Sequence, residues 1–236
     1  ESRGLGDVYK RQAWINPAAG TTNNNRFFDN RNAGGNDNKP FFALTAQGSG
    51  FSVVLSNAVN SVFWGNSGNG IINTETTYHI ALTYQGTTAE LYLNGQSLGA
   101  KSTVGFDALR TLSVGNRMGD DRPWQGLMDD IRIYDRALTA GEIAQIYNAG
   151  GGHQHSATSN YGQRLVVDSS NRVLAWQSQG KEFSQSTTAN RPVYVALGMN
   201  GRPAVRFDGT NDLAVASVSL GNLSLIHISE PTRLLS

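Results

Sequence analysis

The sequence has no cysteine among its 236 residues, which excludes a disulfide framework and a thiolate metal site. It also has no apolar run that approaches the roughly 20 residues of a membrane-spanning helix, so we expect no membrane insertion. Charged residues are scarce as well, at 16% of the chain.

The few charges balance one another. The chain carries 19 basic and 18 acidic residues, without a cluster of Lys and Arg. Such a sequence lacks the basic patch that would attract phosphate backbones or anionic lipids. We therefore expect no nucleic-acid partner.

Glycine, by contrast, is abundant, with 27 residues. In Thr77–Tyr84 every second residue is large and apolar, which is typical of a half-buried strand. Asn94-Gly95 follows the next alternating run and predicts a tight hairpin. The predicted fold class is all-β, a two-sheet antiparallel β-sandwich of jelly-roll type with one short helix near residues 140–148.

The stretch Gln125–Gly150 reads QGLMDDIRIYDRALTAGEIAQIYNAG. Its first half, in which apolar residues alternate after a pair of carboxylates, predicts a strand. Thr139 and Glu142 are three residues apart and have the spacing of a helix capping box. Gly150 suits the C-terminal end of that helix.

Two patterns in these stretches carry a resemblance. G-x-x-D-D-[IV]-R-[IV]-Y-x-R-A-L-[ST]-x-x-E-[IV] occurs at residues 126–143, and H-[IV]-A-L-T-Y with L-Y-[LV]-[ND]-G occurs between residues 79 and 95. The chain resembles laminin-G-like domains of the concanavalin A-like lectin/glucanase superfamily. The resemblance implies a jelly-roll sandwich and an extracellular or cell-surface location.

The ends of the chain differ from the rest. Residues 1–12 and 223–236 resemble the translation of one sequencing adapter on opposite strands, and we set them aside as non-native tails. Residues 13–150 then form the laminin-G-like sandwich without its N-terminal strand. Residues 151–159 are a glycine-rich linker by composition.

Residues 160–222 resemble the opening half of a second concanavalin A-like module, with the motif RPAVRFDGTND. In the family, the strand with this FDG motif lies beside the last strand of the sandwich. An unpaired strand edge is a template for strand addition. We therefore expect Pro203–Ala216 to pair with the strand at residues 128–134 and to complete the first sandwich.

The resemblance also implies a structural calcium ion held by a carboxylate of the closing strand. Neighbours on a strand point to opposite faces, so only one of Asp129 and Asp130 can take part. We choose Asp129 as the ligand. On a regular strand Asp129 shares the face of Ile131 and Ile133, and Asp130 is left to pair with Arg132. Calcium prefers six to eight oxygens, and one Asp with backbone carbonyls and water would form a weak site. The alternative is that the carboxylate caps the strand or forms a salt bridge.

Asp208 and Asp212 of the FDGTND motif match the acids of the family in the second segment. They are either calcium ligands or turn formers. Ca²⁺ in a structural role is the cofactor that we expect.

Lectin-like sandwiches hold sugars by stacking and by bidentate hydrogen bonds, from loops or a concave face. The loop with Asp120 and Asp121 also contains Trp124, which is either a stacking platform for a pyranose or a plug at one end of the sandwich. Tyr92 and Glu90 lie on the polar face of a predicted strand and are candidates for a concave-face contact.

Glucanases share this fold, but a retaining glycosidase needs two carboxylates about 5–5.5 Å apart. The E-x-D-x-E triplet of the family is missing, and no G-x-S-x-G motif or P-loop occurs. We predict a non-catalytic module of a larger secreted or surface bacterial protein, with a glycan or a matrix protein as its partner. The alternatives are a spacer or adhesion repeat without a sugar ligand, and a degenerate glucanase.

Overall fold

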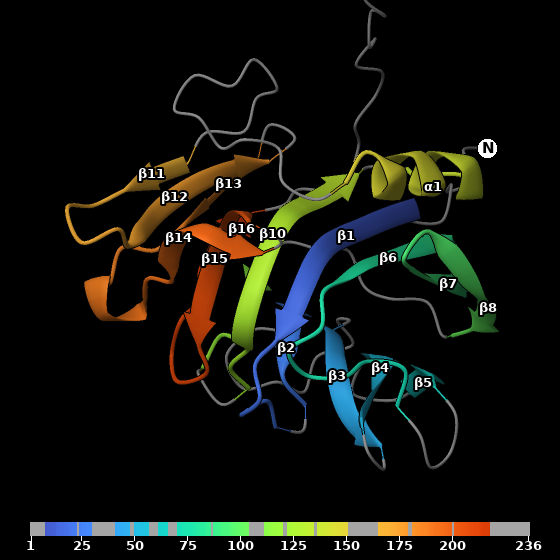
Figure 1. The fold of residues 1–236 in the computed structure, drawn as a ribbon. Helices are drawn as coiled ribbons and strands as arrows, with labels where there is room; N and C mark the ends of the chain where they lie inside the picture. The colour runs from blue at the N-terminus through green and yellow to red at the C-terminus, as the bar shows by residue number, and fades with distance from the viewer. Residues whose placement is uncertain are drawn as a thin grey trace, which may run out of the picture.

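A computed structural model of the protein describes residues 8–22, 24–29, 41–47, 50–56, 61–65, 70–85, 87–103, 111–119, 122–134, 136–150, 165–178, 181–199 and 201–217. Strands predominate in these ranges and form two antiparallel sheets, with one α-helix (Figure 1). The predicted all-β antiparallel sandwich is confirmed.

The first sheet, sheet A, has seven strands. Their order is β14 (Val193–Met199), β15 (Arg202–Asp208), β10 (Gln125–Tyr134), β1 (Val8–Pro17), β6 (Tyr78–Gln85), β7 (Thr88–Leu93) and β8 (Gln96–Ser102).

The second sheet, sheet B, has nine strands. Their order is β11 (Leu165–Val167), β12 (Val173–Ser178), β13 (Lys181–Ser184), β16 (Ala214–Ser217), β9 (Thr111–Val114), β2 (Arg26–Asp29), β3 (Phe41–Gln47), β4 (Gly50–Ser56) and β5 (Ser61–Trp64). A short 3₁₀ helix, η1 (Thr188–Asn190), precedes β14.

One apolar core fills the space between the sheets. Ile80 and Leu82, two of the alternating residues of β6, face it as their spacing predicts. Trp176 and Phe207, from the second segment of the chain, belong to the same core. Residues 165–217 therefore share the core of the first sandwich.

Both sheets are extended by this second segment, as the orange and red strands beside β10 show (Figure 1). β15 pairs with β10, from Gln125 opposite Asp208 to Met128 opposite Val205. β16 pairs with β9 in the other sheet. The segment Pro203–Ala216 is thus divided between the two sheets.

β1 begins at Val8, inside the segment 1–12 that the sequence led us to set aside. It lies between β10 and β6 and pairs with both along most of its length. A strand between two neighbours can pair its backbone N–H and C=O groups on both edges. The sheet therefore continues through residues 8–12.

The sequence-based placement of Asp129 is corrected by a β-bulge in β10. Gln12 pairs with Arg132 and Trp14 pairs with Asp129, so Asp130 and Ile131 both lie opposite a single residue of β1. Asp130 has a φ of +48°, a left-handed conformation like that of the first residue of a G1 bulge. Since paired residues share a face, Asp129 lies on the face of Trp14 and not on that of Ile131.

Helix α1 (Ala140–Asn148) covers part of the outer face of sheet A. Ile143 packs on Ala81 and Tyr92, and Tyr147 stacks on Trp14 with 5.7 Å between the ring centroids. Within the described ranges, the helices fall short of the length and apolarity that a bilayer crossing needs.

Candidate functional site

A groove of about 320 Å³ opens between α1 and the C-terminal end of β10. We call it the α1 groove. Both walls come from the stretch that closes the sandwich, so a strand and the helix that follows it form the site together. The residues that line it are Arg132, Tyr134, Arg136, Leu138, Glu142, Gln145, Ile146 and Ala149.

The helical wall is fixed by the predicted capping box. The Thr139 hydroxyl accepts the backbone N–H of Glu142 at 3.3 Å, and the Glu142 carboxylate accepts that of Thr139 at 2.8 Å. Ile143, on the next turn, is fully buried against the sheet. Capping and burial together orient the groove side of the helix, which carries Glu142 and Gln145.

Two ion pairs set the charge of the α1 groove. Arg136 binds Glu142 with both terminal nitrogens, at 3.0 and 2.6 Å, and Arg132 binds Asp130 at 2.6 Å. The hydrogen bonds from Arg136 and from the Thr139 backbone hold the pKa of Glu142 at about 2. Each guanidinium is thus balanced by a carboxylate, and the groove suits an uncharged polar ligand better than a multiply charged one.

Tyr134 provides the aromatic surface of the groove. It is half-buried and packs against the cluster beneath α1. Burial raises the pKa of its phenol, although Arg132 acts in the opposite direction. The hydroxyl therefore stays protonated at neutral pH and can donate a hydrogen bond.

Tyr92, a predicted sugar contact, lies beneath α1 instead of on an open face. Only 4% of it is exposed, because Ile143 and Leu138 cover it. Burial, together with a hydrogen bond to Glu90, raises the pKa of its phenol to about 12. The prediction of a surface role for Tyr92 was wrong, since the helix was not taken into account as a cover for that strand.

Glu90 is half-buried on the same face of sheet A and accepts a hydrogen bond from the Ser97 hydroxyl. Thr83 lies opposite Glu90, and Lys10 lies opposite both Thr83 and Tyr134. One cross-strand row therefore leads from Glu90 to the α1 groove, although Glu90 does not line it.

Trp124 is fully buried and packs edge-on against Phe27, with 5.4 Å between the ring centroids. A ring without an exposed face cannot stack on a sugar, so of the two alternatives the structural plug is correct. Asp120 and Asp121, the other predicted loop ligands, lie outside the described residues.

The three predicted calcium ligands lie in two separate places. Asp208 lies opposite Gln125, four residues along β10 from Asp129, which corresponds to about 13 Å. The Asp208 carboxylate accepts backbone N–H groups two and three residues further on, and Asp212 accepts the N–H of Asp208 at 2.9 Å. Both act as turn formers. Across the described ranges, no group of three or more His, Cys, Asp or Glu side chains lies together in a way that could hold a metal ion.

Sequence reasoning missed the groove residues Arg132, Arg136 and Gln145. The signal was present: Glu142, Gln145 and Ala149 are spaced by three and four residues, which places them on one face of a helix. That this face would turn toward the end of β10 could not be read from the spacing.

The profile of the concanavalin A-like lectin/glucanases superfamily matches residues 11–144. The chain belongs to this family. The predicted laminin-G-like resemblance is thereby confirmed for more than half of the chain. A search of curated proteins gave no match.

Solved structures that are similar to this chain include a heptameric pentraxin from Limulus polyphemus, at 19% identity and a TM-score of 0.51, over 62% of this chain and 72% of the pentraxin. Domain 4 of an extracellular arabinanase from Geobacillus stearothermophilus, in complex with arabinotriose, has 21% identity and a TM-score of 0.45, over 60% of this chain and 66% of that domain. The similarity to the pentraxin concerns the fold alone.

Proposed function

We propose that this chain is a non-catalytic binding module that holds a short saccharide in the α1 groove. The observation that carries the proposal is the lining of that groove. It combines the ring of Tyr134, the amide of Gln145 and the guanidinium of Arg136 around a space of about 320 Å³. Planar groups that form paired hydrogen bonds, beside an aromatic ring, suit the hydroxyl groups of a sugar.

The volume agrees with this assignment. Small-molecule sites commonly enclose about 300–1,000 Å³, and the α1 groove lies at the lower end of that range. A ligand of one or two sugar rings is therefore expected. An extracellular or cell-surface location is part of the proposal, because glycans are displayed there.

The acids in the groove support binding without hydrolysis. Glycoside hydrolysis uses two carboxylates, one of which must be protonated. Glu142 is the one carboxylate among the described residues that line the groove, and its pKa of about 2 keeps it ionised. It is also held by Arg136 and by the helix cap, so it serves to position its neighbours.

A glycan array with the intact chain tests the proposal, followed by titration of any ligand found. Tyr134→Phe removes a hydroxyl, and Gln145→Ala removes an exposed amide. Each is expected to weaken binding several-fold, since one hydrogen bond contributes about 0.5–1.5 kcal/mol. Asn148→Ala, on the same helix but outside the groove, is the matched control.

Two results would count against the proposal. Binding that all three variants retain equally would show that the ligand lies elsewhere. An array without any signal, from protein with an intact unfolding transition, would favour the alternative of a spacer or adhesion repeat.

A further inference from the structure

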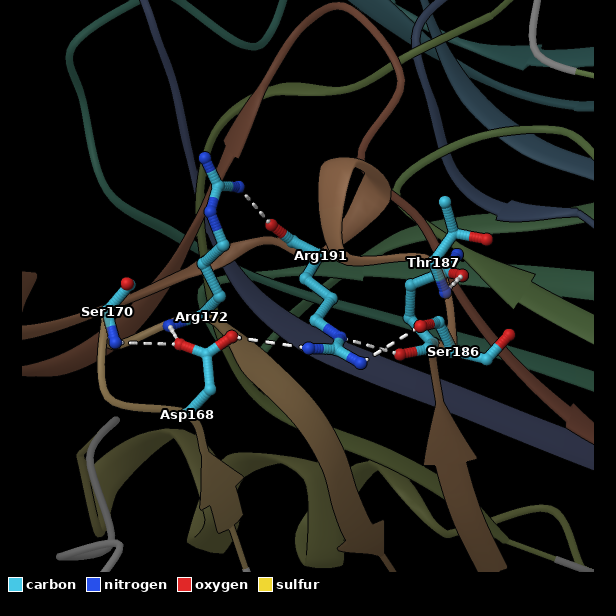
Figure 2. A network of polar contacts seen from close by, with 7 residues as sticks. Asp168, Ser170, Arg172, Ser186, Thr187 and Arg191 are labelled. Carbon is cyan, nitrogen blue, oxygen red and sulfur yellow. Dashed lines mark hydrogen bonds and ion pairs between the residues drawn. The ribbon is translucent and has the colours of Figure 1, made fainter.

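Residues 165–217 form a unit with internal polar contacts of its own, which we call the donor unit. The Asp168 carboxylate accepts the backbone N–H groups of Ser170 and Arg172, at 2.9 and 3.0 Å, and pairs with Arg191 at 3.2 Å (Figure 2). Arg191 also donates to the carbonyl oxygens of Gln185 and Ser186, at 2.9 Å each. Every partner in this network belongs to the donor unit.

The donor unit meets the rest of the protein along one edge of the sandwich. β9 and β10 are consecutive strands in opposite sheets, and so are β15 and β16. β15 pairs with β10, and β16 pairs with β9. We call the edge formed by β9 and β10 the acceptor edge.

The side chains of the donor unit fill the core at this edge. Val205 and Phe207 of β15 and Ala214 and Ala216 of β16 are all buried in the common core. Trp176 of β12 borders the same small crevice as Met128 of β10. An acceptor edge without its donor would expose both unpaired backbone and apolar surface, which favours capture of another strand pair.

We propose that the acceptor edge is a strand-binding site for a second copy of this chain, whose donor unit takes the place of the resident one. Two copies would then exchange donor units reciprocally. The contacts made across the edge are the same within one chain and between two chains, so both forms bury the same core. This inference is independent of saccharide binding.

Concentration selects between the two forms. Because the resident donor unit belongs to the same chain as its acceptor edge, its binding is intramolecular and does not depend on protein concentration, so the closed single chain dominates in dilute solution. Crowding of copies, or refolding at high protein concentration, shifts the balance toward exchange. The structure therefore provides a means of linking copies that does not require a further interface.

Engineered cysteines test this in a chain that has none of its own. Leu127 of β10 lies opposite Arg206 of β15, and directly opposed residues in antiparallel strands have Cα atoms about 4.5–5.5 Å apart, which a disulfide can span. One intact chain carries Leu127→Cys and another carries Arg206→Cys. The two are unfolded, mixed, refolded at low and at high concentration, oxidised, and analysed by non-reducing electrophoresis.

We expect a disulfide-linked pair of chains whose yield rises with the refolding concentration. The control mixes Leu127→Cys with Leu197→Cys, because Leu197 is 77% exposed on β14 and does not pair with the acceptor edge. The matched pair should link several-fold more than the control. Equal yields for the matched pair and the control would overturn the proposal.

A chain with both Leu127→Cys and Arg206→Cys checks the register on which the test depends. At low concentration it should form a disulfide within one chain, seen as faster migration without a change in mass. Failure to link within the chain would also overturn the proposal, since donor and acceptor would then not meet as described.

Discussion

The ring of Phe207 lies directly against the backbone of Gly115. A Cβ atom at Gly115 would come within 2.1 Å of Phe207 Cε1, and Gly115 has a φ of +83°. Gly115 comes directly after β9, and its lack of a side chain leaves room for the ring of Phe207 from β15, a strand from the other part of the chain. This contact joins the donor unit to the acceptor edge.

We expect Gly115→Ala to destabilise the protein by about 2–5 kcal/mol, because a positive φ strains alanine and the methyl group displaces Phe207. Gly99→Ala is the matched control: its φ is +92°, but nothing lies within 4 Å of the added Cβ. It should cost only about 1–2 kcal/mol. Urea unfolding measures both values, and equal losses would contradict the role of Phe207.

Asp168→Asn should lower the unfolding midpoint of the protein at neutral pH. The hydrogen bond from the Arg172 backbone, with those from Ser170 and Arg191, holds the pKa of Asp168 below its usual 3.8. Because the folded-state pKa is depressed, this stabilisation is present above pH 3.8 and disappears as the pH falls further.

The difference in unfolding midpoint between wild type and Asp168→Asn should therefore become smaller in acid. Thermal unfolding between pH 7 and pH 2 measures this. Glu182→Gln in β13 is the control, since its carboxylate reaches only the Gln177 amide, at 3.5 Å, among the described hydrogen bonds. A constant difference across this pH range would contradict an electrostatic role for Asp168.

Glu142→Gln should remove part of the acid sensitivity of the fold. The pKa of Glu142 is lowered from 4.5 to about 2, first by Arg136 and then by the Thr139 backbone. The contribution of the carboxylate is complete above pH 4.5 and is lost as the pH falls toward 2. Glutamine retains the cap but not the ion pair, so the variant should lose less stability than wild type as the pH falls from 4.5 toward 2.

Thr139→Ala provides the contrast for that experiment. It removes the hydroxyl of the cap and should cost about 1 kcal/mol at neutral pH. The same hydroxyl donates to the Glu142 carboxylate at 3.1 Å, but this contributes less to the low pKa of Glu142 than Arg136 does, so the cost of Thr139→Ala should change less with pH than that of Glu142→Gln. Thermal unfolding of the two variants over the same pH series distinguishes them. Identical pH profiles would refute the assignment of the effect to Glu142.

Chelation of divalent cations should leave the melting temperature unchanged. Asp208 and Asp212 are engaged in their own turn, and Asp129 lies four residues along β10 from the position opposite Asp208. A thermal scan with chelator and another with added calcium measure this directly. A clear rise in melting temperature with calcium would contradict it and would favour a site that includes Asp129.

Much of the sandwich could be predicted from local patterns. Alternation in β6 placed Ile80 and Leu82 in the core, and the spacing of Thr139 and Glu142 gave the capping box. Both depend on neighbours within one element, where periodicity and hydrogen-bond geometry are fixed by the backbone.

The site was less accessible to such reasoning. Tyr92 was placed correctly on the face of β7 opposite to Leu91, but whether that face is open depends on α1, which comes almost 50 residues later. Trp124 could equally plug the sandwich or bind a sugar until its neighbours, Phe27 among them, were known. The face of Asp129 changed because one extra residue in β10 reverses the alternation.

The sequence by itself determined the layered all-β architecture, the capped helix near residues 140–148 and the membership of the family, because these follow from short-range periodicity and from motifs. The tertiary structure decided where residues 165–217 lie, which face α1 covers and which polar residues meet in the α1 groove. Those outcomes depend on pairing between strands far apart in the chain, and the energy of such pairing comes from a core that no single segment contains.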